Sequence, residues 1–404
     1  MAHLKSTSSR IATVDITNDG NHALLVVDDS KRLKVFRGMN LISSHKLLDH
    51  ASCLSIFYPS SLRKGGHSNN PNNNPNNPSR SSSLPAVGVG TGSYVYIYRS
   101  MRPYYKFTLP TIKINSDELH IWNSARLNSN ISNQETLNLL IELQKTLQTQ
   151  SSENNVQSLT FRSMFILSIT DKTEQLKYIE SYKSAELMVN TCITCMTSIQ
   201  KQDVETNAIS SLIIGTENNE ILFLDSSGCN IDKTINIPST PFHLSVIGLL
   251  SVDYRIVIAT RSNTIYTIRN GKLLGNFIQL ESAITSMIAF NKNIIVSCIN
   301  KTLYAYHIKG NNIKLWSLYF KHNITTIEPM IGNQFQGNDN NFFLCGFENG
   351  EIAMYNNNQQ IHLLKSASNS PITALKFGKY GREDSTLIIL NQTGCLNVKI
   401  MSRR

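Results

Sequence analysis

The sequence is poor in charged residues and lacks a long uninterrupted apolar segment. Of its 404 residues 16% are charged and 41% are hydrophobic, a composition that excludes a globally disordered chain and can bury a large core. The most apolar stretch, residues 243–260, is interrupted by Ser251, Asp253 and Arg255. It therefore falls short of the run of about 18 apolar residues that a membrane-spanning helix needs. The first residues also lack the apolar segment of a secretory signal peptide, which predicts a cytoplasmic protein.

The signatures of common enzyme classes are missing as well. There is no Gly-x-x-x-x-Gly-Lys phosphate loop, no His-Glu-x-x-His zinc motif and no Gly-x-Ser-x-Gly nucleophile elbow. Cys192 and Cys195 have redox or zinc spacing but no second pair. Residues 15–20 resemble the start of a calcium loop without its closing carboxylate and also fit a hairpin turn. We expect a protein that is not an enzyme, with no catalytic residue, metal or cofactor; an enzyme with its site in a central channel is the alternative.

The net charge of +10 is not concentrated in any Lys/Arg-rich block. A spread of this kind is compatible with an ordinary solvated basic surface. It is equally compatible with an acidic protein partner, an anionic membrane surface or nucleic acid. Charge alone does not decide among these.

Seven similar strand patterns recur along the chain. Each consists of a small polar turn followed by a segment with apolar first and third positions, which is the alternation typical of a β-strand. The seven pairs are Leu33/Val35, Tyr94/Tyr96, Ile221/Phe223, Ile265/Thr267, Leu303/Ala305, Ile352/Met354 and Leu396/Val398. With the apolar segments before each turn, three or four strands recur about every 44 residues, the period of propeller blades. The pattern predicts an all-β, seven-bladed β-propeller over residues 1–404 that lacks the Trp-Asp and Gly-His signatures of WD40 repeats.

Two longer spacings interrupt the repeat. Residues 65–83 are rich in Asn, Pro and Ser, cannot bury apolar surface and are predicted to be a disordered loop. Residues 112–190 are predicted to be a helical insertion after the second blade. Ser132 and Glu135 form a capping box at the start of one helix, and Asp171 begins a second. We expect this amphipathic pair to pack either on its own propeller or on a partner.

Five segments resemble a known family. Residues 94–110 (Tyr-Val-Tyr-Ile-Tyr-Arg-Ser-Met-Arg-Pro-Tyr-Tyr-Lys-Phe-Thr-Leu-Pro) and 377–388 (Phe-Gly-Lys-Tyr-Gly-Arg-Glu-Asp-Ser-Thr-Leu-Ile) are similar to the N-terminal propeller of the Bardet–Biedl syndrome 1 family, and residues 32–38, 212–221 and 346–352 fit it in the same order. The resemblance implies a non-catalytic docking subunit of the BBSome, a coat-like complex that supports cilium assembly and ciliary membrane-protein traffic. It also implies a location in the cytoplasm, at the basal body or centrosome, and at the cilium and its membrane.

The resemblance further implies a set of partners. They are the other BBSome subunits, an Arf-like small GTPase in its GTP form, ciliary membrane-protein cargo and, peripherally, the membrane surface, with no nucleic acid expected. We expect the GTPase contact where the first and seventh blades meet. The candidate residues are Arg32, Lys34, Arg37, Lys379, Tyr380, Arg382 and Glu383. Residues 377–384 alternatively form a purely structural turn, and the alternative function is a basic propeller that binds anionic lipid or nucleic acid directly.

The end of the chain follows closely on the seventh repeat. Residues 372–377, 386–390 and 396–401 supply three strands, and residues 1–9 are too polar to supply a convincing fourth. We expect a three-stranded seventh blade with an exposed edge, a known pairing and aggregation hazard. We expect the C-terminal appendage domain of the family to be absent, and a form extended by about 20 residues to be more stable or more soluble.

Overall fold

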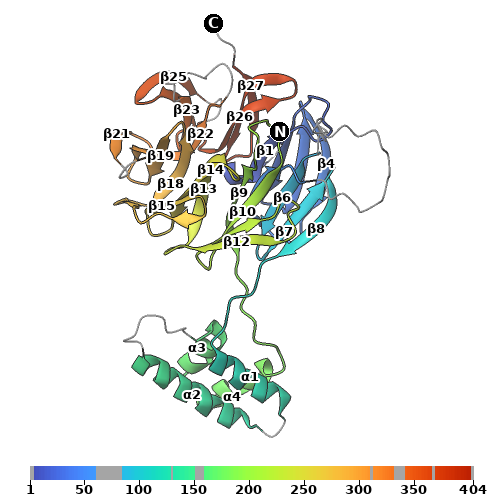
Figure 1. Ribbon diagram of the computed structural model, residues 1–404, viewed down its shortest axis with the longest axis vertical. Coiled ribbons are helices and arrows are strands. Elements are labelled where there is room, and N and C mark those ends of the chain that lie inside the picture. Colours follow the sequence, from blue (N-terminus) through green and yellow to red (C-terminus); the bar gives the residue numbers. More distant parts are fainter. Residues whose placement is uncertain are drawn as a thin grey trace. The chain divides into compact units, whose positions relative to one another are not determined.

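The computed structural model describes residues 4–60, 84–128, 131–150, 159–309, 313–331, 342–365 and 369–401. Two compact units are present: Met1–Thr108 together with Cys192–Arg404, and Leu109–Thr191. The first unit is built of strands and the second of helices (Figure 1). The loop predicted at residues 65–83 lies outside the described residues.

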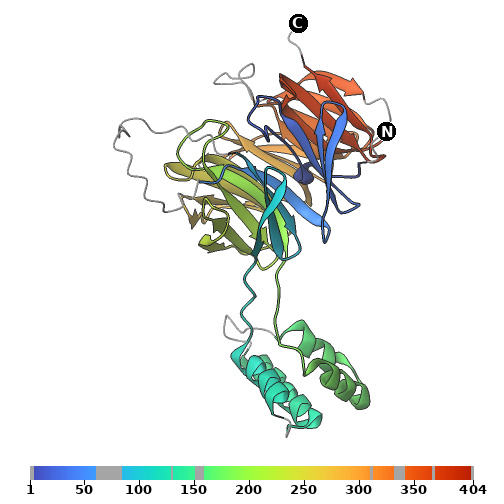
Figure 2. The same ribbon diagram turned by 90° about the vertical axis from the view of Figure 1, so that its right-hand side faces the viewer.

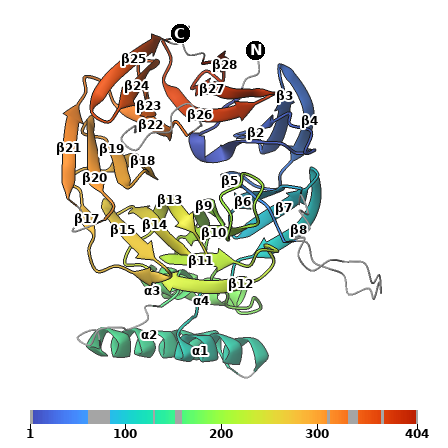
Figure 3. The ribbon, with the colours of Figure 1, turned by 45° about the horizontal axis from the view of Figure 1, so that its top comes forward.

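Seven antiparallel sheets form the first unit and are arranged as the blades of a propeller (Figure 3). We number these blades one to seven in chain order. Blades one to three are β1 (Ile11–Val14), β2 (Ala23–Asp28), β3 (Arg32–Arg37), β4 (Asn40–Lys46); β5 (Ala51–Phe57), β6 (Ala86–Thr91), β7 (Tyr94–Arg99), β8 (Arg102–Thr108); and β9 (Ile193–Gln200), β10 (Ser210–Thr216), β11 (Glu220–Leu224), β12 (Ile231–Asn236). The predicted seven-bladed propeller is therefore confirmed.

The remaining four blades complete the ring. Blades four and five are β13 (Pro241–Leu249), β14 (Asp253–Thr260), β15 (Thr264–Arg269), β16 (Lys272–Leu273), β17 (Ile278–Gln279); and β18 (Ile284–Phe290), β19 (Asn293–Cys298), β20 (Thr302–His307), β21 (Lys314–Tyr319). Blades six and seven are β22 (Ile324–Pro329), β23 (Phe342–Phe347), β24 (Glu351–Asn356), β25 (Gln359–Lys365); and β26 (Ile372–Tyr380), β27 (Glu383–Asn391), β28 (Leu396–Ile400). As expected, the described part of the seventh blade has three strands.

The core lies between neighbouring blades, because each sheet buries both of its faces. Leu25 and Val27 of β2 belong to a cluster shared with the second blade, whereas Leu24 and Val26 belong to one shared with the seventh. Successive side chains of a strand point to opposite faces, so a fully apolar strand serves two interfaces at once. This explains why the apolar residues of β2, Ala23 to Val27, are all buried.

In one of the seven strands the most buried positions are not those of the predicted apolar pair. In β7 the buried side chains are Val95 and Ile97, while Tyr94 and Tyr96 are only half-buried. The Lys106 ammonium lies 3.5 Å from the centroid of the Tyr94 ring, a cation–π contact. A shift of one residue moves a strand's whole side-chain pattern to the opposite face.

The described residues of the helical unit form four helices instead of the predicted pair (Figure 2). They are α1 (Ser116–Leu127), α2 (Asn133–Gln150), α3 (Phe161–Ser168) and α4 (Lys172–Tyr182). The two predicted starts are confirmed: the backbone N–H of Glu135 donates to the Ser132 hydroxyl over 3.1 Å, and the Thr173 N–H donates to the Asp171 carboxylate over 2.9 Å.

The apolar faces of these helices pack within the unit itself. Trp122 of α1, Leu140 of α2, Ile166 of α3 and Ile179 of α4 are buried in one cluster. The sequence pattern predicted two helices with apolar faces, which correspond to α2 and α4. In the structure α1 and α3 supply the apolar surface against which these faces pack. A backbone hydrogen bond joins the segment that enters the unit to the segment that leaves it: the Ile112 N–H donates to the Val189 carbonyl over 2.8 Å. We call this hydrogen bond the clamp.

Candidate functional site

The first and seventh blades meet at a seam across which the part of the chain that the structure describes shares no strand. The turn between β26 and β27 approaches the loop between β1 and β2, where His22 and Gly381 exchange two backbone hydrogen bonds of 2.8 and 2.9 Å. Gly381 has a φ of +62°, a left-handed conformation in which glycine carries no steric penalty. The turn that carries most of the candidate residues therefore also helps to close the ring.

Tyr380 of this turn faces inward. It is 6% exposed, and its hydroxyl donates to the Gly38 carbonyl of the first blade over 2.5 Å. Burial raises the pKa of this phenol above its ordinary value, so it remains a neutral donor. Its place in the seam agrees with the structural-turn alternative for this one residue.

The other three candidates of the seventh blade are exposed. Arg382 and Glu383 point into solvent at the turn, and the Lys379 ammonium lies 3.1 Å from a carboxylate oxygen of Asp384. An exposed ion pair of this kind contributes little to stability. These side chains are therefore free to engage a partner at small cost.

The three candidates on β3 lie in different surroundings. Arg37 ends the strand beside Gly38 and is 3.3 Å from Asp19, so it lies at the same end of the seam as the turn. Arg32 begins the strand, about 17 Å away at the usual rise per residue. Lys34, between them, is 2.6 Å from Asp28, whose carboxylate is 3% exposed. The structure thus groups Arg37 with the turn and separates Arg32 from it.

The ion pair between Asp28 and Lys34 is part of the first blade's own structure. Burial pushes the pKa of this carboxyl upward, but hydrogen bonds from Lys34, Ser30 and the Arg32 backbone outweigh it, and the pKa lies below its ordinary value. A buried carboxylate without its cation would be strongly destabilising. Lys34 is therefore part of the first blade's structure.

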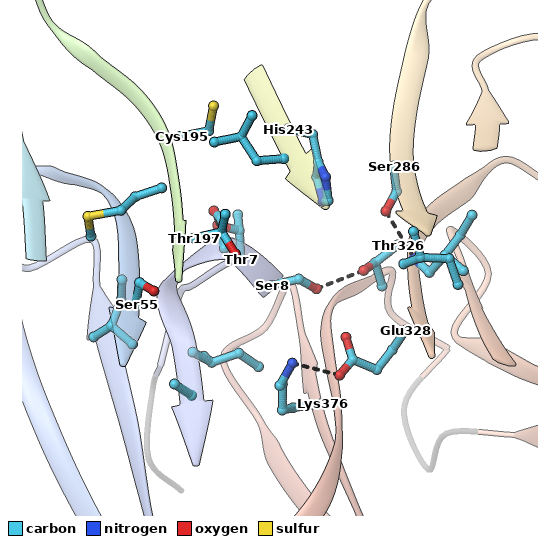
Figure 4. Close-up of a pocket in the computed structure, with 18 of the residues that line it drawn as sticks. Thr7, Ser8, Ser55, Cys195, Thr197, His243, Ser286, Thr326, Glu328 and Lys376 are labelled. Carbon is cyan, nitrogen blue, oxygen red and sulfur yellow. Dashed lines mark hydrogen bonds and ion pairs between the residues drawn. The ribbon is translucent and has the colours of Figure 1, made fainter. Parts of the chain in front are cut away.

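A second candidate site is the central channel, a cavity of about 620 Å³ lined by the inner strand of every blade (Figure 4). The N-terminal 3₁₀ turn Ser8–Arg10 also lines it, and the Ser8 hydroxyl lies 2.7 Å from that of Thr326. Most of the other polar groups are hydroxyls too. The ones drawn include Thr7, Ser55, Thr197 and Ser286.

Charge in the channel is compensated internally. The Lys376 ammonium lies 2.7 Å from Glu328, a carboxylate whose oxygen also accepts the Phe377 N–H over 3.4 Å. His243 points into the same space, and its Nδ1 is sealed from solvent without a hydrogen-bond partner. Burial, and secondarily the charge of Lys376, lowers the pKa of His243 to about 4. The ring is therefore neutral at physiological pH, and the channel presents hydroxyls and one closed ion pair.

The two weak metal patterns have structural explanations. The Asp15 carboxylate accepts backbone N–H groups of Asp19 at 3.2 Å and Gly20 at 2.7 Å, which makes residues 15–20 a hairpin turn. Cys195 is buried, and desolvation raises the pKa of its thiol to about 12, whereas Cys192 is exposed. Within the described ranges, no three His, Cys, Asp or Glu side chains form a group that could hold a metal.

Sequence reasoning missed the role of the N-terminal segment. Leu4 is fully buried in the cluster between the first and seventh blades, and its N–H donates to the Gly394 carbonyl over 2.9 Å. The Ser6 hydroxyl donates to the Val27 carbonyl over 2.7 Å. One leucine in a polar segment has no periodicity, so only the burial itself reveals its role. Among the described helices none is both long and apolar enough to cross a bilayer.

Comparison with known proteins identifies the family. Residues 1–269 match the model of the family described as ciliary BBSome complex subunit 1. The chain is 28% identical over 409 residues to BBSome complex member BBS1 of Homo sapiens and 27% identical over 409 residues to that of Mus musculus. Each alignment covers 100% of this chain and 63% of the relative, so the chain spans less than two thirds of these proteins.

Solved structures agree with this assignment. Two crystal structures of BBS1N in complex with ARL6DN, one soaked with mercury and one with lead, each match with a TM-score of 0.73 and 28% sequence identity. Each match covers 100% of this chain and 95% of the other. The predicted relationship is confirmed, and the chain belongs to the ciliary BBSome complex subunit 1 family.

Proposed function

We propose that this propeller is a non-catalytic docking platform of a BBSome-type coat complex and that it binds an Arf-like small GTPase in its GTP form. One observation carries the proposal: the matched structures are of BBS1N in complex with ARL6DN, and the match extends over 100% of this chain. The wider role, in ciliary membrane-protein traffic with other BBSome subunits and cargo, rests on the family alone. So do the cytoplasmic and ciliary locations.

We place the GTPase contact at the turn end of the seam between the first and seventh blades. Arg382 and Glu383 are exposed there, and Lys379 and Arg37 lie at the same end. Arginine is a frequent anchor of protein interfaces because its planar guanidinium makes several directed hydrogen bonds. Tyr380 serves the contact indirectly by holding the turn against the first blade.

The lysine and arginine farther along β3 have smaller parts in this proposal. Lys34 is occupied by Asp28, and Arg32 lies at the opposite end of the strand. A GTPase centred on Arg382 would reach Arg32 only with a footprint that spans the whole seam. Charge reversal at Arg382 should therefore weaken binding more than reversal at Arg32.

The test measures binding of GTP-loaded and GDP-loaded Arf-like GTPase to the whole chain. Arg382→Glu should weaken GTP-dependent binding about 30-fold, the effect of losing a central anchor of about 2 kcal/mol. Lys272→Glu is the matched control, since it makes the same charge change at an exposed site on the fourth blade. Circular dichroism verifies that both variants are folded.

Two results would contradict the proposed contact. One is unchanged binding for a double variant with Arg37→Glu and Arg382→Glu, which reverses charge on both blades. The other is equal loss of binding in Arg382→Glu and Lys272→Glu, which would indicate long-range charge instead of a local contact.

Direct binding of an anionic surface is the second candidate function, and the distribution of charge favours it. Residues 109–191 contain seven Lys or Arg and nine Asp or Glu, so the rest of the chain holds 31 basic against 19 acidic residues. The excess positive charge therefore belongs to the propeller, and peripheral contact with an anionic leaflet can coexist with GTPase binding. Co-sedimentation with phosphatidylserine vesicles, with and without GTPase, separates the two functions.

A further inference from the structure

Half of the propeller's excess positive charge lies in two neighbouring blades. Residues 241–319, which form blades four and five, contain eight Lys or Arg and two Asp or Glu, an excess of six. The whole propeller holds 31 basic and 19 acidic residues, an excess of 12. Within these two blades only residues 310–312 (Gly-Asn-Asn) lie outside the described ranges, and they carry no charge. The basic character of the chain is therefore concentrated in space, although the sequence has no Lys/Arg-rich block.

A row of three basic side chains crosses the fourth blade. Arg255 of β14 lies opposite Arg269 of β15, and Arg269 lies opposite Lys272 of β16. Cross-strand partners share one face of a sheet, so the three side chains leave the same face. Val257 and Ile265 occupy this face of β14 and β15, and both belong to the cluster shared with the fifth blade. The basic row therefore faces the fifth blade.

One side-chain contact joins this row to the fifth blade. The Arg255 guanidinium donates through Nη1 to the Ile308 carbonyl over 2.7 Å, and the Ile308 N–H donates to the Lys292 carbonyl over 2.7 Å. Lys309 follows Ile308 in the chain, so both lysines extend from the backbone that Arg255 contacts. Lys292 and Lys309 are exposed, whereas Arg255 is half-buried. Arg255 therefore forms the floor of a groove between the two blades, and the two lysines lie at its rim.

The fifth blade adds a further lysine to this groove. The Lys314 ammonium lies 4.9 Å from the centroid of the Tyr304 ring, which packs against the cluster shared with the fourth blade. Lys314 therefore faces the fourth blade, the neighbour of the fifth in the ring (Figure 3). We call the space between these facing side chains the basic groove. Its residues are Arg255, Arg269, Lys272, Lys292, Lys309 and Lys314.

One acidic residue offsets part of this charge. Asp253 accepts a hydrogen bond from Arg269 Nε over 3.2 Å and one from Asn270 Nδ2 over 2.8 Å. The hydrogen bond from Arg269, followed by that from Asn270, holds the pKa of Asp253 below its ordinary value, so the carboxylate is ionised. Glu281, the other acidic residue of these blades, precedes β18, whereas Lys292 follows it, so Glu281 lies at the opposite end of the strand. The described residues of blades four and five therefore leave the groove with a large positive excess.

The charges of the row repel one another in the free protein. Like charges directly opposite on neighbouring strands destabilise a sheet. Arg255 and Arg269 form one such pair, and Arg269 and Lys272 form another. An anion between them is attracted to each and also relieves their mutual repulsion. The groove is therefore suited to a negatively charged ligand.

We propose that the basic groove binds an acidic segment of a partner protein. The depth of the groove favours this occupant over a flat or rod-shaped polyanion. Arg255 is half-buried between two packed sheets, where an acidic side chain of an extended segment reaches it. A bilayer surface or a nucleic-acid duplex contacts only the exposed rim, such as Lys292 and Lys309. The proposal is independent of the GTPase contact, which we place at the seam between the first and seventh blades.

A second copy of this chain is a poor occupant of the groove. Each copy has a net charge of +10, and each would bring its own basic groove to the assembly. Like charges at an interface disfavour association, whereas an acidic segment is steered toward the groove from a distance. The partner is therefore a different, acidic protein.

The test measures binding of two fluorescein-labelled peptides to the whole chain. The acidic peptide is Gly-Glu-Glu-Ser-Glu-Glu-Gly, and its neutral counterpart is Gly-Gln-Gln-Ser-Gln-Gln-Gly, which has the same length and nearly the same shape. Fluorescence anisotropy should show the acidic peptide binding about tenfold more tightly, because only its side chains pair with the groove. Equal affinities, or no binding of the acidic peptide, would overturn the proposal.

Charge reversal on the two walls tests whether binding is local. Lys272→Glu on the fourth blade and Lys309→Glu on the fifth should each weaken binding of the acidic peptide about fivefold, as expected for an exposed ion pair. Lys46→Glu is the matched control, because it makes the same charge change at an exposed site on the first blade. An equal loss in Lys46→Glu would mean that overall charge attracts the peptide, and the groove would be refuted.

A variant of the groove floor separates a protein segment from a membrane. Arg255→Met should weaken binding of the acidic peptide about tenfold, because it removes a charge-assisted hydrogen-bond donor that the peptide reaches. Co-sedimentation of the chain with phosphatidylserine vesicles should be unchanged in this variant. Vesicle binding that Arg255→Met weakens, without binding of the acidic peptide, would assign the groove to a membrane and overturn the proposal. If Arg255→Met does not fold by circular dichroism, the wall variants still decide.

Two further outcomes separate this site from the others. Arg382→Glu should leave binding of the acidic peptide unchanged, and Lys309→Glu should leave GTPase binding unchanged, since the two sites lie on different blades. Loss of peptide binding in Arg382→Glu would place the acidic segment at the seam and refute the groove. A concentration-dependent dimer that Lys309→Glu abolishes would assign the groove to a second copy and refute the partner segment.

Discussion

Substitution of Leu4 by alanine tests how the propeller ring is closed. Leu4 is fully buried between the first and seventh blades, in a cluster that includes Ile11 and Ile388. Among the described residues no strand is shared across this seam, so packing and a few hydrogen bonds hold them together there. The N-terminal segment should therefore contribute stability out of proportion to its length.

The expected cost of Leu4→Ala is about 3 kcal/mol. Three carbon atoms are removed, and at about 0.8 kcal/mol for each the lost transfer free energy is about 2.4 kcal/mol. A residual cavity adds to this cost, while relaxation of a segment near the chain end reduces it. Leu48→Ala is the matched control, because Leu48 is 79% exposed and should change stability by less than about 0.5 kcal/mol.

The two tryptophans make the assay specific for one unit. Trp122 belongs to the helical unit, and Trp316 of the fifth blade stacks on Phe343 with 6.4 Å between ring centroids. In a Trp122→Phe background, urea unfolding followed by fluorescence reports on the propeller alone. Hydrogen exchange at the His22 and Gly381 amides, which bond across the seam, should accelerate in Leu4→Ala.

Equal unfolding midpoints for Leu4→Ala and Leu48→Ala would refute this account of the seam. So would a stability loss in Leu4→Ala with unchanged exchange at His22 and Gly381. The first result would mean that the segment contributes nothing, and the second that it acts elsewhere.

Two further substitutions test buried polar groups, one in each unit. The pKa of His243 is lowered from 6.5 to about 4, so the unfolded chain binds a proton that the folded chain does not, and stability is lost as pH falls between these values. His243→Leu should reduce the acid-induced loss of unfolding free energy by about 2 kcal/mol. The measurement compares the unfolding free energy in urea at pH 7 and at pH 4.5, and the same difference in the variant and the parent chain would contradict the prediction. Glu118→Ala should destabilise the helical unit by about 3 kcal/mol, because its buried carboxylate accepts hydrogen bonds from the Thr160 backbone and hydroxyl and from the Ser163 hydroxyl. Trp122 fluorescence should report an earlier transition, whereas Glu142→Ala at an exposed site should not, and an equal shift in both would contradict the assignment.

The ring could be predicted from sequence because its strands obey a regular alternation. Every blade requires buried residues on its third strand, and pairs such as Leu33/Val35 and Leu303/Ala305 supply them. The alternation is ambiguous at Tyr94 and Tyr96, since tyrosine suits either a buried or a half-exposed position, and the fully buried Val95 and Ile97 alternate with them. Periodicity thus located the strand but not its orientation.

Two other features carry too little local signal to be predicted. The helix α3 has eight residues, and the apolar residues that mark it span barely two turns. The inward direction of Tyr380 is equally invisible, because the structure determines it through Gly38, far away in sequence. The repeats predicted the position of the seam. They did not predict which candidate residues form the contacts that close the ring.

The clamp between Ile112 and Val189 has a consequence for how such proteins diversify. Because the chain departs and returns through adjacent backbone atoms, the entropic cost of closing the inserted sequence grows only slowly with its length. The second and third blades retain their own contacts, so selection can enlarge, reshape or replace the insertion without rebuilding the propeller. This position is therefore a natural acceptor for new modules, and for grafted reporter domains in the laboratory.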